Sequence, residues 1–393
     1  MIRRFRRNGI FAAARSGDVE RLRDMLRRDP MLVRARDAAG ATALHLAIAS
    51  PPAVRLLLEF GAEPNARDES DNALPLHYAA SGGNLETVRA LLDAGSDVQG
   101  EGDIHALEVI GWATCFDEPR REIVDLLVAR GAGHHVFSAI ALADPELLRE
   151  VVAHDPGTLQ RRLAPSEQEQ TALHYVIAPP DGLVGGRFRT GGHYDLLELL
   201  IELGADPNAA DAKGRTPLVL ATLRGDRQAM RILHDAGVRL PPPPETPAEA
   251  PSSFGASVGP VTPMLAATDM DTTLAWYRAL GFELAGSHGG VGRIDWAFLR
   301  FGEAEIMISA VDPGGADAPS PMSLWIRTER IDDLYALLRR RQLECGQAFL
   351  AGRSDERPDI AFAQDLHTAF YGQREFCVRD PDGVAINFYQ PIP

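Results

Sequence analysis

The feature that most constrains this chain is a short segment that recurs along its first 240 residues. Four variants of it are GATALHLAIA (residues 40–49), NALPLHYAAS (72–81), QTALHYVIA (170–178) and GRTPLVLAT (214–222). Each variant is followed by an apolar helical stretch that ends in glycine, and His45 and His77 hold the same place in successive copies. A period of roughly 33 residues predicts a stacked array, because each unit of such an array buries its apolar face only against its neighbours.

Each copy also carries the local signals of two antiparallel helices. The threonine at the head of the segment can cap the first helix, and a proline one residue later fits its first turn. A glycine after the second helix supplies a left-handed C-cap. This pattern resembles the ankyrin repeat. The resemblance implies about seven repeats, with degenerate copies at residues 11–37, 103–131 and 137–163, and a non-catalytic surface that binds a protein partner.

Histidine is the most chemically suggestive residue type in the repeats. We expect three histidines to bridge neighbouring repeats through hydrogen bonds to the backbone rather than to bind metal: His45, His77 and His174. The pair His134 and His135 is not at zinc-ligand spacing from Cys115. A Gly-rich insertion at residues 179–192 lengthens one repeat beyond the common period, and it is either a variable partner contact or an exposed loop.

A Pro-, Ala- and Ser-rich stretch, LPPPPETPAEAPSSFGASVGP, separates the repeats from the rest of the chain. It contains almost nothing to bury, so we expect a semi-rigid, extended linker. The expected domains are therefore the repeat array at residues 1–240, the linker at 241–259 and a second domain at 260–393.

The second domain shows the pattern of short strands. Strands are expected within residues 260–270, 282–287, 293–302, 304–311 and 322–328, and a final hairpin at 372–392 turns at the tetrapeptide DPDG. Helices are expected at residues 271–280 and 330–344, the second of them amphipathic. The order is therefore βαβββ, twice.

Two of these segments resemble the vicinal-oxygen-chelate superfamily, which includes glyoxalase I, extradiol dioxygenases, and fosfomycin- and bleomycin-resistance proteins. TPMLAATDMDTTLAWYRALGFEL resembles its opening strand and helix, and YGQREFCVRDPDGVAINFYQ resembles its closing hairpin in the bleomycin-resistance-like branch. The expected fold class is α + α/β, an ankyrin helical solenoid followed by a βαβββ-βαβββ domain of this type. Function diverges widely within such a fold.

The resemblance also implies where a metal would bind. Enzymes of this superfamily usually draw His and Glu ligands from the first and fourth strands of each module, and those positions fall here on Thr262, Met307, Ser323 and Asn387. These side chains cannot replace imidazole and carboxylate around a divalent Lewis acid, so we expect neither a metal nor a cofactor. The remaining histidines and glutamates are expected at the surface, in loops or off the ligand positions: His288, His367, Glu303, Glu305 and Glu375.

Strand alternation predicts what takes the place of the metal. Side chains two residues apart share a face of a strand, so the substituted positions share a face with aromatic, thioether and polar groups. The candidate ligand-binding residues are Thr262, Met264, Glu305, Met307, Ser323, Trp325, Arg327, Asn387 and Tyr389, with Arg374 at the rim. Such a face suits a small-molecule cleft, or alternatively the core of a dimer. Twelve arginines against nineteen carboxylates in residues 260–393 favour a cationic ligand.

Composition excludes several classes of function. A net charge of −15 argues against nucleic acid as a partner. No apolar stretch is long enough to cross a bilayer as a helix, and the basic start lacks the apolar run of a secretory signal, so we expect no membrane association. Three widely spaced cysteines, Cys115, Cys345 and Cys377, form no disulfide framework, which suits the cytoplasm. No nucleophile motif, P-loop or dinucleotide fingerprint is present.

The preferred interpretation is a cytoplasmic bacterial binding protein that pairs a protein-docking array with a metal-free domain holding a small, flat or cationic molecule. One rival is a metal-dependent lyase or dioxygenase of the same superfamily, and the other is a scaffold in which both domains bind proteins. We expect a homodimer through the C-terminal domain, because apolar strands such as MSLWIRT otherwise stay uncovered. The alternative is a monomer in which ankyrin repeats cover the sheet.

Overall fold

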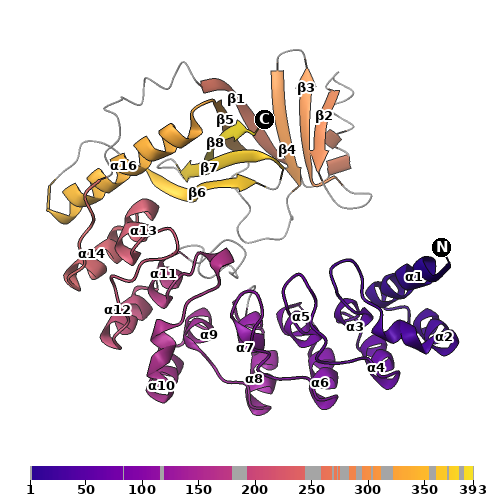
Figure 1. Cartoon of the computed structure of the whole chain (residues 1–393). Helices are drawn as coiled ribbons and strands as arrows, with labels where there is room; N and C mark the ends of the chain where they lie inside the picture. The colour runs from indigo at the N-terminus through magenta and orange to yellow at the C-terminus, as the bar shows by residue number, and fades with distance from the viewer. Residues whose placement is uncertain are drawn as a thin grey trace. The chain divides into compact units, whose positions relative to one another are not determined.

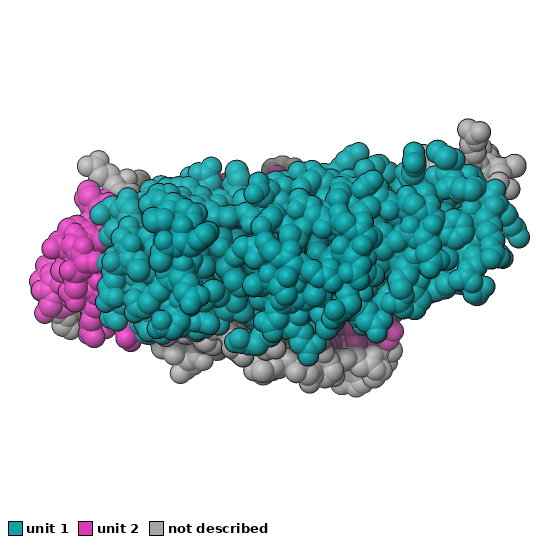
Figure 2. All heavy atoms as spheres, turned by 90° about the horizontal axis from the view of Figure 1, so that it is seen from below, with its two compact units in different colours: residues 1–217 teal, residues 218–393 magenta. Residues whose placement is uncertain are grey.

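The computed structural model describes residues 2–82, 84–115, 119–178, 193–243, 258–267, 270–271, 273–274, 283–288, 294–301, 304–310, 322–353, 360–369, 371–379 and 385–392. These residues belong to two compact units, Met1–Pro217 and Leu218–Pro393, which are coloured teal and magenta in Figure 2. Several predicted features lie outside the described residues: the Gly-rich insertion, most of the linker, residues 275–280 of the first predicted C-terminal helix, and the DPDG turn.

The first unit is built from successive helix pairs. Figure 1 shows α3, α5, α7 and α9 in one row and α4, α6, α8 and α10 in a second row beneath it. The pairs are α1 (Ile2–Ser16) with α2 (Val19–Arg28), α3 (Ala43–Leu46) with α4 (Pro51–Glu59), α5 (Pro75–Gly82) with α6 (Leu85–Asp93), α7 (Glu108–Trp112) with α8 (Arg121–Ala129), α9 (Val136–Ala141) with α10 (Pro145–His154), and α11 (Ala172–Ile177) with α12 (Tyr194–Glu202). Three 3₁₀ turns, η1 (Pro30–Arg34), η2 (Pro156–Gln160) and η3 (Pro165–Glu167), complete the connections.

The histidine bridges predicted from the repeat are confirmed at two positions. His45 Nδ1 accepts from the Thr42 amide at 3.1 Å, and its Nε2 lies 3.2 Å from the carbonyl oxygen of Ala73 in the next repeat. His174 Nε2 makes the equivalent contact with the Arg215 carbonyl at 2.8 Å. Each ring therefore caps its own helix and ties it to the following loop, which is a structural role.

The His77 ring packs closely against the loop that follows its repeat. It accepts from the Leu74 amide at 3.0 Å, and its ring lies against Gly100 of the next loop. A Cβ at Gly100, whose φ is +65°, would come within 2.5 Å of the His77 ring. Glycine is therefore required there both for the left-handed backbone and for the close approach.

The second unit contains one eight-stranded sheet with the order β2-β3-β4-β1-β5-β8-β7-β6. Its strands are β1 (Val258–Ala267), β2 (Glu283–His288), β3 (Trp296–Phe301), β4 (Ala304–Ala310), β5 (Met322–Thr328), β6 (Ala361–Ala369), β7 (Gln373–Arg379) and β8 (Ala385–Pro391). The two βαβββ modules meet where β1 pairs antiparallel with β5, and each module has one parallel pair, β1 with β4 and β5 with β8. The predicted fold class is confirmed.

Helix α16 (Ile331–Leu350) covers one face of the second module. Its apolar residues form a core with β6, β7 and β8: Ile331, Leu334, Leu338 and Leu343 pack with Phe362, Phe376 and Val378. On the first module, Ala297, Leu299 and Ile308 pack against Met270 and Leu274 on the corresponding face. The apolar residues of each strand thus point one way, and the alternating residues point to the opposite face.

Two more helices, α13 (Pro217–Arg224) and α14 (Arg227–Asp235), pack on α16 inside the second unit. Gln342 of α16, which is 1% exposed, donates to the Thr222 carbonyl at 2.8 Å and accepts from the Ile360 amide at 2.6 Å. Arg224 donates to the Phe362 carbonyl at 2.7 Å. The contacts therefore divide the chain near Pro217, upstream of the linker, and the boundary predicted at residues 240–260 stays a prediction.

Candidate functional site

The strand register brings most of the predicted ligand-binding residues onto one face of the sheet. Thr262 is the cross-strand partner of Trp325, which in turn pairs with Asn387. Met264 pairs with both Met307 and Ser323. We call this surface, opposite α16, the Trp325 face, and it comprises Thr262, Met264, Glu305, Met307, Ser323, Trp325, Arg327, Asn387 and Tyr389.

The centre of the Trp325 face is well packed. The Trp325 indole nitrogen donates to the Ser323 hydroxyl at 3.2 Å, and the rings of Trp325 and Tyr389 lie 6.0 Å apart at 58°. Thr262 and Met307 are buried. Burial raises the pKa of the Tyr389 hydroxyl and the charge of Glu305 raises it further, whereas Arg327 and a hydrogen bond with Thr262 oppose the shift. Tyr389 therefore stays a neutral hydroxyl at physiological pH.

Within one chain, Arg374 does not join this face. Its guanidinium lies 2.6 Å from the Asp332 carboxylate of α16, so the side chain points to the helix-covered face. Its cross-strand partners are Thr368 and Gln390. Because successive residues of a strand face opposite sides, it is Glu375, the next residue, that joins the Trp325 face.

The sequence reasoning missed an aromatic pair on β3. Phe298 pairs with Met307 and is therefore on the Trp325 face, and the Trp296 ring stacks beside it at 6.4 Å and 4°. Arg300, the next residue on the same side, contacts the Glu305 carboxylate at 2.8 Å. The signal was available, since Trp296, Phe298 and Arg300 occupy alternate positions of the predicted strand.

His367 and Glu375 both lie within strands, and Glu375 is not at the surface as expected. His367 belongs to β6 and Glu375 to β7, where the two residues are cross-strand partners. Glu375 is only 8% exposed. Its carboxylate accepts from the Tyr371 hydroxyl at 2.5 Å and lies 3.4 Å from His367 Nε2. His288 ends β2 opposite Trp296, and Glu303 lies outside the described residues.

The residues at the superfamily's metal positions do not fit a metal. Thr262, Met307, Ser323 and Asn387 supply hydroxyl, thioether and amide groups where imidazole and carboxylate ligands are needed. Within the described ranges, no three His, Cys, Asp or Glu side chains gather in a way that could hold a metal ion. We therefore derive no chemical step through a metal.

Burial suppresses the reactivity of two of the three cysteines. Cys115, Cys345 and Cys377 are all buried. Burial raises the pKa of the Cys115 thiol to about 11, and it also raises the pKa of Cys377. Since the thiolate is the reactive form, neither of these two thiols is activated at neutral pH.

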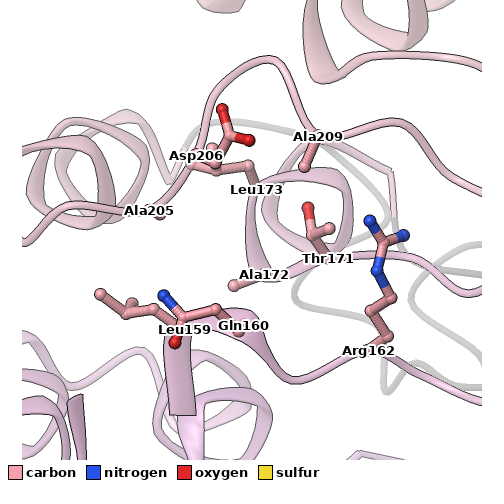
Figure 3. Close-up of a pocket in the computed structure, with 9 residues that line it drawn as sticks. All are labelled: Leu159, Gln160, Arg162, Thr171, Ala172, Leu173, Ala205, Asp206 and Ala209. Atoms are coloured by element: carbon pink, nitrogen blue, oxygen red, sulfur yellow. The ribbon is translucent and has the colours of Figure 1, made fainter. Parts of the chain in front are cut away.

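The repeat unit has a hollow of about 270 Å³ near its last helix pair. Figure 3 shows Asp206 and Arg162 on opposite sides of Thr171. The lining is otherwise mostly small and apolar: Leu159, Gln160, Ala172, Leu173, Ala205 and Ala209. Arg162 donates to the carbonyls of Glu169 and Ala210 at 3.0 and 2.7 Å, so its charge holds the loops together. Arg162 and Asp206 are the two charged side chains of the lining.

Family models agree with the two-part architecture. Models of ankyrin repeats match residues 10–102 and 187–234, and the model of the glyoxalase/bleomycin resistance protein/dioxygenase superfamily matches residues 259–388. In the part of the chain that the structure describes, no helix is long and apolar enough to span a membrane.

Similar proteins match parts of the chain. The E3 ubiquitin-protein ligase KEG of Arabidopsis thaliana is 24% identical over 281 residues, which are 59% of this chain and 17% of that protein. Human ankyrin repeat and SOCS box protein 16 is 29% identical over 206 residues, 52% of this chain and 38% of that protein. The chain thus spans well under half the length of these relatives.

A solved glyoxalase/bleomycin resistance protein/dioxygenase superfamily member from Vibrio splendidus 12B01 is 18% identical, with a TM-score of 0.25, and covers 33% of this chain and 97% of its own. The superfamily of the C-terminal domain is assigned from the family model. This chain combines N-terminal ankyrin repeats with a C-terminal domain of the glyoxalase/bleomycin resistance protein/dioxygenase superfamily.

Proposed function

We propose that this chain is a binding protein in which the ankyrin repeats dock a protein partner and the Trp325 face holds a small molecule without covalent chemistry. The observation that carries the proposal is the composition of that face. Aromatic rings, two methionines and a few polar groups occupy one side of the sheet, and hydroxyl, thioether and amide groups stand at the superfamily's metal positions. Small-molecule sites have this mixture of apolar area and sparse polar groups.

A ligand screen tests the proposal directly. Thermal unfolding of the full chain is measured against antibiotics and metabolites, since a ligand that binds only the folded state raises the midpoint. Trp325→Ala should abolish the shift, whereas Ile392→Ala, at an exposed position in the same unit, should preserve it. A screen without hits, together with a stable co-purified protein, would instead favour the scaffold hypothesis.

The enzyme hypothesis is tested by metal analysis of the purified protein. Stoichiometric Zn, Ni, Mn or Fe would overturn the metal-free part of the proposal.

The net charge of −15 supports the absence of nucleic acid, and the cytoplasmic location remains a prediction from the cysteine content.

We also propose a homodimer through the C-terminal domain, which would cover apolar parts of the sheet with a second copy. Sedimentation of the full chain at tens of micromolar, with and without a ligand from the screen, measures it. A monomer under both conditions would contradict the dimer and leave the ligand site within one chain.

A further inference from the structure

We propose that the β7 end of the Trp325 face recognises an organic cation, with Glu375 as its counter-ion and the rings of Tyr389 and Trp325 beside it. This inference rests on the proposed ligand-binding function and names the class of ligand. It starts from Glu375, a residue that the sequence pattern placed at the surface.

Glu375 is a buried carboxylate without a permanent positive partner. It is 8% exposed, and its oxygens contact a neutral hydroxyl, Tyr371, and the ring of His367, which carries charge only when protonated. Among the described residues, His367 is the one basic group within ion-pair distance of it. Burying a carboxylate is costly unless a cation and hydrogen bonds compensate it, so this group can gain from an incoming positive charge.

Aromatic rings stand next to this carboxylate. Glu375 and Tyr389 are directly opposed on β7 and β8, which brings their Cβ atoms to about 5 Å. The Trp325 ring lies 6.0 Å beyond, on the neighbouring strand β5. An ammonium or ring-nitrogen cation placed over these faces is attracted by the ring quadrupoles as well as by the carboxylate.

The other charged side chains on the Trp325 face also favour its β7 end as the position of a ligand cation. The Glu305 carboxylate contacts Arg300 at 2.8 Å, so its charge is already compensated. Arg327 is exposed and directly opposes Tyr389 from the β5 side, so it lies about one strand spacing from Tyr389 and about two, or roughly 10 Å, from Glu375. Arg379 lies four residues along β7, about 13 Å away by the rise of a strand. A ligand cation therefore keeps away from both arginines by lying over β7, on the Glu375 side of the Tyr389 ring.

Three probes of nearly equal shape separate charge from ring stacking. 1-Methylquinolinium is a cation, quinoline is neutral at pH 8, and 2-naphthoate is an anion. Their dissociation constants for the full chain are measured by equilibrium dialysis. We expect the cation to bind at least tenfold more tightly than quinoline and 2-naphthoate to bind most weakly. Equal or tighter binding of 2-naphthoate would overturn the assignment of a cation site.

Variants test whether Glu375 supplies the negative charge that favours the cation. Glu375→Gln keeps the shape and should reduce the preference for the cation over quinoline to less than threefold. Tyr389→Leu keeps the carboxylate and should weaken the cation about tenfold, which serves as the second test if Glu375→Gln does not fold. The control is Glu344→Gln, because Glu344 pairs with Arg340 on α16, away from the Trp325 face. A Glu375→Gln protein that is less stable but keeps the full preference for the cation would show a purely structural carboxylate and refute the inference.

Trp325→Ala distinguishes this failure from failure of the proposed function. If quinoline or 2-naphthoate binds and Trp325→Ala weakens that binding, the small-molecule face stands and only the cation assignment is wrong. If none of the three probes binds and the ligand screen gives no hit, both the cation site and the proposed small-molecule function are refuted.

Discussion

Replacing Gln342 by alanine should destabilise the C-terminal unit far more than its position on a helix surface suggests. Gln342 is 1% exposed and joins three elements, because its amide donates to Thr222 of α13 and accepts from the Ile360 amide before β6. Truncation leaves the part-buried N–H of Ile360 without its partner and removes one of two hydrogen bonds to the Thr222 carbonyl, which still accepts from the Gly225 amide at 3.1 Å. At about 1–3 kcal/mol for the orphaned N–H and about 0.5–1.5 kcal/mol for the lost second bond to Thr222, the free energy of unfolding should fall by about 1.5–4.5 kcal/mol.

The assay is thermal and urea unfolding of the full chain followed by tryptophan fluorescence. Trp276, Trp296 and Trp325 belong to the second unit by residue number and only Trp112 to the first, so fluorescence reports chiefly on the second. For a unit of this size the expected loss corresponds to a fall of roughly 10 °C in the midpoint.

Gln347→Ala is the matched control. Gln347 lies on the same helix and donates to the Pro241 carbonyl at 2.9 Å, but this bond is exposed. Its loss should cost less than about 0.5 kcal/mol, as for other surface substitutions. If both variants lose equally little, the packing of α13 and α14 on α16 does not contribute to stability and the argument fails.

Four further predictions follow from the same structure. Gly346→Ala should destabilise the second unit, because the added Cβ would meet Thr222 Cγ2 at 2.4 Å. The clash should cost about 1–3 kcal/mol, offset by about 1 kcal/mol of gained helix propensity. The control, Gly82→Ala, lies at a helix end with open space, so urea unfolding should show no loss of stability. Burial lowers the pKa of His135 to about 3 and that of His77 to about 4, so both stay neutral when folded and bind protons when unfolded. The repeat unit should therefore lose about 2 kcal/mol for each histidine as pH falls from 6.5 to 5, and circular dichroism that shows no loss of stability over this range would contradict it. Limited proteolysis in residues 241–259 should give fragments of about 240 and about 134 residues. The two fragments should elute together in gel filtration, because α13 and α14 pack on α16. Fragments that elute separately would count against that packing. Converting Thr262 and Ser323 to His with Met307 and Asn387 to Glu should create divalent-metal binding by calorimetry, and an inert variant would show that the assumed register is wrong.

The repeat array follows from the sequence alone, because its contacts are local. The regular period, the Thr and Gly caps and the His45 and His174 bridges depend on neighbours within one or two units. The two βαβββ modules were also predictable, since strand and helix periodicity alternate clearly and DPDG marks the closing hairpin.

Tertiary structure decided the details of the candidate site. Strand alternation placed Trp325 and Asn387 together correctly, but the side of Arg374 depends on the register of β7, and a difference of one residue moves a side chain to the other face. Glu375 became a candidate because β6 and β8 flank it and bury it, which neither its own segment nor the weakly patterned β6 reveals.

The packing of α13 and α14 on α16 was equally invisible in the sequence. Gln342 and Thr222 lie 120 residues apart, on opposite sides of a linker whose composition predicts separation. A linker's composition reports only that it cannot bury surface itself. Whether the elements on either side pack together depends on the complementarity of their surfaces, and here a glycine, Gly346, permits the close approach that makes the buried contact.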